Sequence, residues 1–158
     1  MKKEWKVYGV FVLLTELVGI ISGLITRDAM GAYSSMDVSV PLTPPAIVFP
    51  IVWTILYALM GIAAARIWLA QPSKERKNGL ILYGIQLIVN FFWSIIFFNM
   101  GAYGVAFVWL VLLWVLIILL IRQFAKVDMI AAKLLIPYLV WVTFAAYLNF
   151  AVWLKSIK

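Results

Sequence analysis

The chain has 158 residues, of which 66% are hydrophobic and only 12% are charged, and its formal net charge is +7. Soluble domains carry about a quarter charged residues, so this composition excludes a water-soluble globular protein and a disordered chain. The sequence contains no Cys and no His, which excludes disulfides, thiolate chemistry and the commonest metal and haem ligands. A mean hydropathy of +1.09 indicates a protein that crosses a membrane several times.

Five stretches are long and apolar enough to form membrane-spanning helices, since about 20 mostly apolar residues cross the hydrocarbon core. They are residues 5–26, 46–69, 80–98, 103–121 and 134–154. The runs are too long and continuous for the strands of a membrane barrel. We therefore predict an all-α membrane protein, a five-transmembrane-helix bundle that forms a single domain over residues 1–158.

The basic residues are distributed unevenly between the two sides of this predicted topology. One side receives Lys2, Lys3, Lys6, Arg66, Lys74, Arg76, Lys77, Arg122, Lys126 and Lys133. The other side receives only Arg27, Lys155 and Lys158. The positive-inside rule then predicts a cytoplasmic N-terminus, and the net charge reflects topology and anionic lipid rather than nucleic acid. The first span begins near residue 5, so no targeting extension is expected, and we predict a bacterial plasma membrane.

The loop over residues 27–45 is long for a compact bundle, and such loops are usually functional or disordered. It ends in Pro41-Leu42-Thr43-Pro44-Pro45, where the three prolines stiffen its exit. We interpret this loop as a lid over the external mouth of the bundle.

Polar and aromatic side chains recur at helical spacing in three of the spans, which in lipid marks the faces that turn inward. In the third span these residues are Tyr83, Gln86, Asn90, Trp93 and Phe97. In the second they are Phe49, Trp53, Tyr57, Met60 and Ala64, and in the fifth Tyr138, Trp141, Ala145 and Leu148, with Asn149 beside them. The three faces predict an apolar pocket for a flat ligand. The alternative is ordinary bundle packing for the rings and interhelical hydrogen bonds for the amides.

Glu16 is the only carboxylate within a predicted span, and an ionisable group at that depth is a functional-site hypothesis. It fits either a site that couples transport to protons or a protonated Glu that is hydrogen-bonded inside the bundle. Arg66, near the basic end of the second span, is expected to extend to the lipid headgroups.

Pairs of small residues four apart permit close approach of helices. Gly19 and Gly23 form such a pair, and Gly61 and Ala65 form another. Either pair fits a homodimer face or internal packing. The sequence has no Ser/His/Asp set, paired carboxylates, metal cluster or phosphate-binding glycine loop, so a hydrolase or an ordinary metalloenzyme is not expected.

Three motifs resemble the translocator-protein or TspO/MBR family, whose bacterial members are called tryptophan-rich sensory proteins. The first runs from Pro44-Pro45 through Phe49, Trp53 and Tyr57 to Met60-Gly61. The second combines Tyr83, Gln86, Asn90, Phe91, Trp93, Ser94, Phe97 and Phe98, and the third Pro137-Tyr138, Trp141, Phe144-Ala145 and Leu148-Asn149. The motifs come in the family's order, and the length and span number also match.

The resemblance implies a five-helix bundle, usually a homodimer, with a pocket beneath the first loop. Family members bind porphyrins and haem, cholesterol, and isoquinoline or benzodiazepine drugs. Several bacterial members promote light-dependent oxidative breakdown of protoporphyrin IX. Together with the three polar faces, the resemblance gives the predicted ligand-binding residues: Pro44, Pro45, Phe49, Trp53, Tyr57, Gln86, Asn90, Trp93, Phe97, Tyr138, Trp141, Ala145 and Leu148.

The chain departs from the family pattern at the lid and in the fifth span. Leu42 and Ala46-Ile47 stand where relatives have Trp and Gly-Trp, and Phe150 replaces the Tyr of the proposed cholesterol motif. Sterol is therefore not the expected ligand. An aromatic site without His or Cys favours metal-free porphyrin, or haem held by ring contacts, with no tightly bound cofactor and no metal site.

These observations give three functional hypotheses. The first is a tetrapyrrole-binding membrane protein that acts as sensor, carrier or scavenger. The second adds light-dependent degradation of bound protoporphyrin, with Trp53 and Trp141 as redox-active residues. The third is a proton-coupled small-molecule transporter that uses Glu16.

Overall fold

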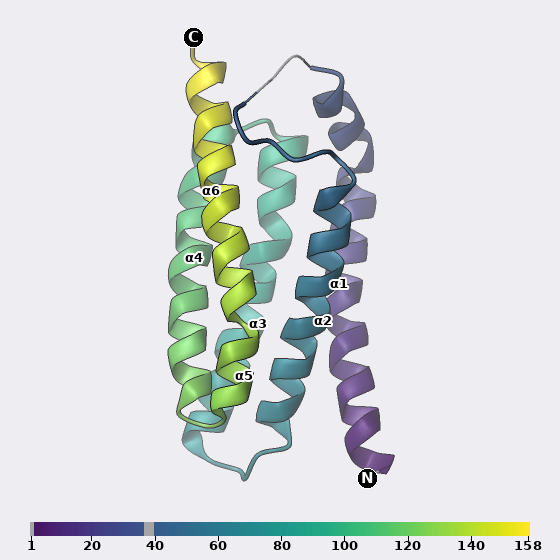
Figure 1. Cartoon of the computed structure of the whole chain (residues 1–158), viewed down its shortest axis with the longest axis vertical. Coiled ribbons are helices and arrows are strands. Elements are labelled where there is room, and N and C mark those ends of the chain that lie inside the picture. The colour runs from purple at the N-terminus through teal and green to yellow at the C-terminus, as the bar shows by residue number, and fades with distance from the viewer. Residues whose placement is uncertain (1, 37–39) are drawn as a thin grey trace.

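The structure is a computed structural model that describes residues 2–36 and 40–158. It contains the helices α1 (Lys2–Ser34), α2 (Val48–Trp68), α3 (Lys74–Ser94), α4 (Tyr103–Ala125), α5 (Met129–Leu134) and α6 (Ile136–Ser156). A π-helical turn, η1 (Ile95–Asn99), continues α3. The helices run up and down in one bundle, with the N- and C-termini at opposite ends (Figure 1).

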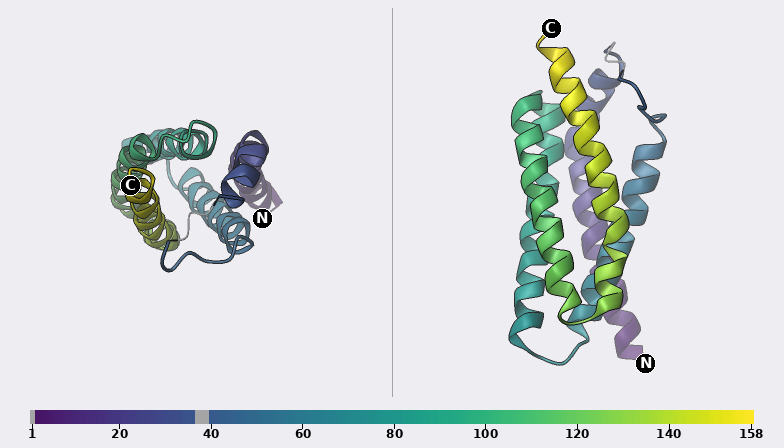
Figure 2. Two further views of the ribbon diagram at one scale, coloured as in Figure 1. Left: turned by 90° about the horizontal axis from the view of Figure 1, so that it is seen from above. Right: turned by 60° about the vertical axis from the view of Figure 1, so that its left-hand side comes forward.

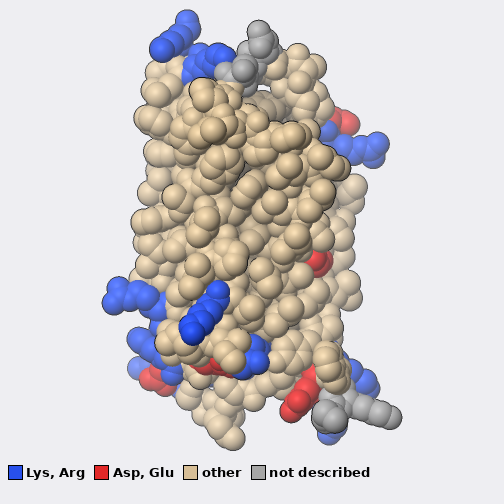
Figure 3. Space-filling view, in the orientation of Figure 1, with Lys and Arg blue, Asp and Glu red and all other residues tan. Residues whose placement is uncertain are grey.

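Five helical segments are long and apolar enough to cross a membrane, which confirms the predicted five-helix bundle. They are Lys3–Ser34, Val48–Trp68, Lys74–Asn99, Tyr103–Ala125 and Met129–Ser156. Lys and Arg gather toward the two ends of the molecule, and a broad band with few charged atoms lies between them (Figure 3). The chain is therefore a multi-pass membrane protein, because such an apolar exterior requires lipid around it.

Local signals fix where several helices begin. Ser73 caps α3, because its side chain accepts a hydrogen bond from the backbone N–H of Arg76 at 3.0 Å. The break between α5 and α6 falls at Leu135, and Pro137 lies in the first turn of α6, where its missing N–H costs nothing. Gly101 takes a positive φ of 60° in the turn before α4, a conformation that glycine adopts without strain.

The first helix continues beyond the span predicted from hydropathy. That span ends at residue 26, whereas α1 runs to Ser34 and includes Arg27 and Asp28. Charged residues end an apolar stretch of sequence, but they do not by themselves end a helix. No proline, which would end it, stands before Pro41. The connection between α1 and α2 is therefore shorter than the predicted 27–45 loop, and its residues 37–39 lie outside the described residues.

The helices pack around a core in which α2, α3, α4 and α6 contribute most of the buried side chains. α1 lies on the outside against α2 and α3, and α6 packs on α4 and α5. Figure 2 shows this arrangement from above, with the described part of the α1–α2 connection running along the edge of the bundle from beside α6 to α2. Gly61 lies directly against the backbone of Val12 on α1, so this small residue serves internal packing.

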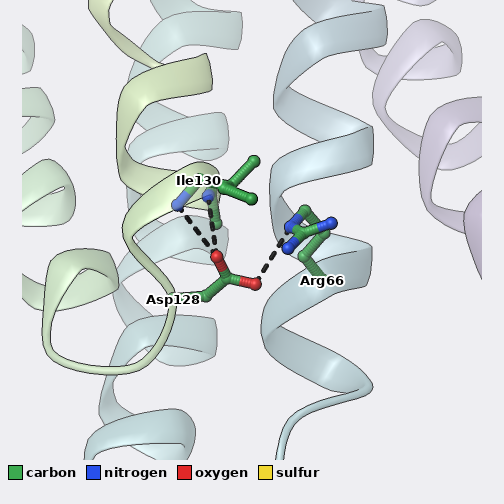
Figure 4. Close-up of polar contacts among 4 residues, drawn as sticks. Arg66, Asp128 and Ile130 are labelled. Atoms are coloured by element: carbon green, nitrogen blue, oxygen red, sulfur yellow. Dashed lines mark hydrogen bonds and ion pairs between the residues drawn. The ribbon is translucent and has the colours of Figure 1, made fainter.

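Arg66 pairs with Asp128, a partner that the sequence analysis did not identify. Its Nε donates to Oδ2 of Asp128 at 2.9 Å, which forms an ion pair. Asp128 also caps α5, because its Oδ1 accepts hydrogen bonds from the N–H groups of Ile130 and Ala131 at 2.9 and 3.3 Å (Figure 4). Sequence reasoning missed this partner because 62 residues separate the two charges.

We expect Asp128→Asn to cost little stability and Asp128→Ala to cost more. Asparagine keeps the cap and loses only a partly exposed ion pair, worth up to about 1 kcal/mol. Alanine removes the cap as well, which costs about 1 kcal/mol more. Unfolding of the detergent-solubilised variants measures the difference, and equal losses for both would contradict the capping role.

Candidate functional site

A chain of hydrogen bonds joins α2, α3 and α6 in the middle of the core. The Tyr57 hydroxyl donates to Oδ1 of Asn90 at 2.7 Å, and Nδ2 of Asn90 donates to the Tyr138 hydroxyl at 2.7 Å. The Tyr138 hydroxyl in turn donates to Oε1 of Gln86 at 2.8 Å. All four side chains are buried. Interhelical hydrogen bonds thus satisfy the amides of α3, the third span. The four linked side chains fix α2, α3 and α6 relative to one another.

Aromatic rings continue this chain into the space between α2 and α6. Trp53 stacks on Tyr57 with ring centroids 5.5 Å apart, and its edge meets Tyr138 at 6.3 Å. Phe49 meets Trp141 at 5.8 Å. These side chains, rather than a close approach of the two backbones, connect α2 with α6. Aromatic rings therefore occupy the space between α2 and α6, next to the hydrogen-bonded hydroxyl and amide groups.

One polar atom in this region has no partner. The indole N–H of Trp141 is buried and makes no hydrogen bond among the described residues. An unsatisfied buried donor costs about 1–3 kcal/mol, and unexplained cases deserve a functional explanation. Trp141 therefore offers a hydrogen-bond donor to a group that enters between α2 and α6.

A second aromatic group lies toward the end of the bundle where α1 finishes. Trp93 stacks on Phe97 at 5.2 Å, and Tyr33 and Tyr103 meet the Phe97 ring at 5.4 and 4.9 Å. The indole N–H of Trp93 donates to Oδ1 of Asn149 at 3.0 Å. Since the group is packed and hydrogen-bonded, it closes this end of the interior.

The described part of the α1–α2 connection is fastened over this second group. Val40 is buried against Phe97 and its neighbours. The hydroxyl of Tyr147 on α6 donates to the carbonyl of Pro41 at 2.9 Å, and the Thr43 hydroxyl donates to the carbonyl of Val40 at 2.7 Å. These contacts hold the segment against α6 at this end of the bundle, and Figure 2 shows it running along the edge from α6 to α2.

The predicted ligand-binding residues fall into two neighbouring groups and a rim. The group between α2, α3 and α6 contains Phe49, Trp53, Tyr57, Gln86, Asn90, Tyr138, Trp141 and Ala145. The group at the bundle end contains Trp93, Phe97 and Leu148. Pro44 is half-buried and Pro45 exposed in the connection that leads to α2.

Sequence reasoning missed three members of the end group: Tyr33, Tyr103 and Val40. Tyr33 and Val40 lay in the predicted loop, and Tyr103 at the edge of a span, where hydropathy gives no sign of burial. Thr15 was also missed; its hydroxyl is hydrogen-bonded to that of Tyr83 inside the bundle.

The acidic and metal-binding features are sparse. Glu16 on α1 is half-buried and makes no hydrogen bond or ion pair among the described residues. The described residues contain no group of three or more His, Cys, Asp or Glu that could hold a metal ion.

The fold and site define a class: a five-helix membrane bundle whose interior is built from tryptophan, tyrosine and amide side chains. A model of the TspO/MBR family matches residues 11–154. The chain therefore belongs to the TspO/MBR family, which confirms the resemblance found in the sequence.

Named relatives agree with this assignment. The chain is 38% identical over 153 residues to the tryptophan-rich protein TspO of Chlorobaculum tepidum, covering 96% of this chain and 97% of that one. It is 39% identical over 111 residues to protein CrtK of Rhodobacter capsulatus, covering 70% and 69%. It is also similar to the translocator protein of Bos taurus, with 35% identity over 146 residues that cover 90% and 86%.

Proposed function

We propose that this chain binds a tetrapyrrole, porphyrin or haem, between α2, α3 and α6, and that it serves as a sensor, carrier or scavenger. The family resemblance supports this ligand class. The observation that carries the proposal is the indole N–H of Trp141, which is buried without a partner among the described residues and whose ring contacts those of Phe49 and Phe144. In this proposal the protein is a homodimer in a bacterial plasma membrane, with its N-terminus in the cytoplasm.

The chemistry of the site suits a metal-free macrocycle better than a strongly ligated haem. The chain has no His and no Cys, so the usual strong axial ligands are absent. Indole and phenol rings stack on a flat π-system through offset or edge contacts. The N–H of Trp141 would donate to a carboxylate of the porphyrin, which also explains why it finds no protein partner.

Entry of a ligand requires local rearrangement, because side chains fill the region between α2 and α6. Trp53 packs on Tyr57 and meets Tyr138, so a macrocycle would have to separate these rings. The backbones of α2 and α6 are not packed on each other, and the rings between them can change rotamers without breaking helix-to-helix backbone contacts. The segment held by Tyr147 and Pro41 then serves as the lid that we infer from the sequence.

The test is a titration of detergent-purified protein with protoporphyrin IX in the dark, followed by tryptophan quenching and the porphyrin absorption band. We expect saturable binding in the micromolar range. Trp141→Phe keeps the ring and loses the donor, so affinity should fall about three- to ten-fold. Trp5→Phe is the matched control, because Trp5 is 73% exposed at the other end of the bundle. Absence of saturable binding, or equal effects of the two variants, would refute the site.

We further propose that light drives oxidative degradation of the bound protoporphyrin. A bound porphyrin supplies the light absorption and, with dissolved oxygen, the oxidant. Trp53 and Trp141 are oxidisable rings within this site, so Trp53→Phe and Trp141→Phe should slow loss of the porphyrin band under illumination when each variant is saturated with porphyrin. Unchanged loss in both variants would remove the indoles from the mechanism.

One observation favours a second function, proton-coupled transport. Glu16 lies within a spanning helix and makes no hydrogen bond or ion pair among the described residues, and such carboxyls mark proton relays in transporters. Proton-driven efflux from proteoliposomes that Glu16→Gln abolishes would support this function. Glu16→Gln should leave porphyrin binding intact if the tetrapyrrole site acts alone.

A further inference from the structure

A groove lies on the outer surface of the bundle, near the end that holds the N-terminus. It has a volume of about 310 Å³ and is lined by Lys6, Val7, Val10, Phe11 and Trp68. The lining comes from the first turns of α1 and the last residue of α2, and Phe11 meets Trp68 at 5.9 Å. Apart from Lys6 the lining is apolar. The groove therefore combines an apolar channel with a positive charge at its rim.

A second positive charge lies beside Trp68, one of the residues that line the groove. The guanidinium carbon of Arg76 sits 4.9 Å from the centre of the Trp68 ring. Nε and Nη2 of Arg76 donate to the Trp68 carbonyl at 3.0 and 2.8 Å. These bonds hold the guanidinium against the groove wall, and a neutral carbonyl does not cancel its charge.

Neither Lys6 nor Arg76 forms an ion pair with a carboxylate of the described residues. At this end of the bundle, Asp128 pairs with Arg66. Glu4 and Glu75, close in sequence to Lys6 and Arg76, form no ion pair in the described structure. An anion that approaches Lys6 and Arg76 would therefore meet two cations that are not held in ion pairs, and the Arg76 guanidinium keeps further N–H groups for a phosphate.

The order of charged and apolar surface along the groove matches that of a phospholipid headgroup and its acyl chain. Lys6 precedes Val10 by one helical turn, so the apolar lining extends about 6 Å farther along α1 than the cation. Tryptophans such as Trp68 sit at the level of lipid headgroups in membrane proteins. A phosphate at Lys6 and Arg76 would thus place the adjoining acyl chain along Val10 and Phe11.

A second outer groove provides the contrast. It has a volume of about 540 Å³ and lies on α4 and α6; its lining is Gly104, Val105, Val108, Trp109, Leu112 and Trp153. This lining contains no charged residue, so the groove has nothing that would select among headgroups. The two grooves separate general lipid solvation from recognition of an anionic headgroup.

We propose that the groove at Lys6, Phe11 and Trp68 is a binding site for one anionic phospholipid, with its phosphate between Lys6 and Arg76. The site is independent of the proposed tetrapyrrole site, because it lies on the outer face of α1 and α2 and shares no residue with it. Its failure would leave the tetrapyrrole proposal standing.

The experiment is native mass spectrometry of the whole chain released from detergent with added phosphatidylglycerol or phosphatidylcholine of identical acyl chains. We expect one tightly retained phosphatidylglycerol per chain. One Lys near the headgroups contributes about 1 kcal/mol, so Lys6→Gln should weaken retention roughly five-fold. Lys126→Gln is the matched control, because this exposed lysine lies at the same end on the α4–α5 turn and removes the same charge.

Two further measurements distinguish binding of a whole lipid from binding of free phosphate and from nonspecific electrostatic attraction of anionic lipid. Val10 is 54% exposed, so Val10→Trp should be accepted by the fold and should displace the acyl chain, which lowers phosphatidylglycerol retention. Glycerol phosphate in excess should not compete, since it lacks the acyl chain. Equal retention of the two lipids, equal loss in Lys126→Gln, full retention in Val10→Trp or full competition by glycerol phosphate would each overturn the proposal.

Discussion

Replacing Gly61 with alanine should destabilise the bundle by about 3 kcal/mol, the upper range for overpacking a well-packed interior. A Cβ at this position would lie 2.6 Å from Cα and 2.8 Å from N of Val12. These are backbone atoms of α1, which cannot move aside as a flexible side chain does. α1 would have to separate from α2, and thermal or denaturant unfolding in detergent measures the loss.

Gly84→Ala is the control for this substitution. Gly84 is also inside a helix, α3, but a Cβ there would meet nothing within 4 Å. Alanine should be neutral or stabilise by up to about 1 kcal/mol through its higher helix propensity. Similar effects at Gly61 and Gly84 would show that close packing of α1 on α2 does not depend on the missing side chain.

Replacing Asn90 with leucine should cost about 2 kcal/mol and loosen the contact between α2, α3 and α6. The substitution keeps the volume but removes the acceptor of the Tyr57 hydroxyl and the donor to the Tyr138 hydroxyl. Interhelical hydrogen bonds in membranes contribute about 0.6 kcal/mol on average and up to about 1.7, and Tyr57 would be left with an unsatisfied buried hydroxyl. Unfolding in detergent measures this loss.

Asn99→Leu is the matched amide control. The Asn99 side chain is exposed and makes one long bond, 3.4 Å to the carbonyl of Ile25. Exposed substitutions of this kind change stability by less than about 0.5 kcal/mol. If Asn90→Leu were no more destabilising than Asn99→Leu, the hydrogen bonds of Asn90 would not contribute to the free energy of unfolding.

Hydropathy and helical spacing were sufficient to predict the five spans and to select the buried amides of the core, but not the buried hydroxyl residues Thr15, Ser22 and Thr26. Gln86 and Asn90 stand out in a sequence because an amide within lipid needs a partner, and both are buried and hydrogen-bonded. The identity of those partners was not predictable. Tyr57 and Tyr138 are 33 and 48 residues away from Asn90, and only the packing of the helices brings them together.

The helix ends show a different limit. Ser73 and Asp128 are good N-cap residues and could have located the starts of α3 and α5, but hydropathy alone places those starts several residues later. The end of α1 at Ser34 had no such signal, because the polar residues after residue 26 favour neither helix nor loop decisively. The unpartnered N–H of Trp141 depends on atomic packing, which no spacing rule describes.

The most direct test of the tetrapyrrole site is to map which tryptophans are oxidised under illumination. The protein is mixed with protoporphyrin IX at a low molar ratio of porphyrin to protein. The oxidant forms at the porphyrin, so peptide mass spectrometry should find added oxygen first at Trp53 and Trp141, which are half-buried. Trp5 and Trp68, which are 73% and 48% exposed, should be oxidised later. Oxidation that begins at the exposed Trp5 and Trp68 would contradict binding between α2, α3 and α6.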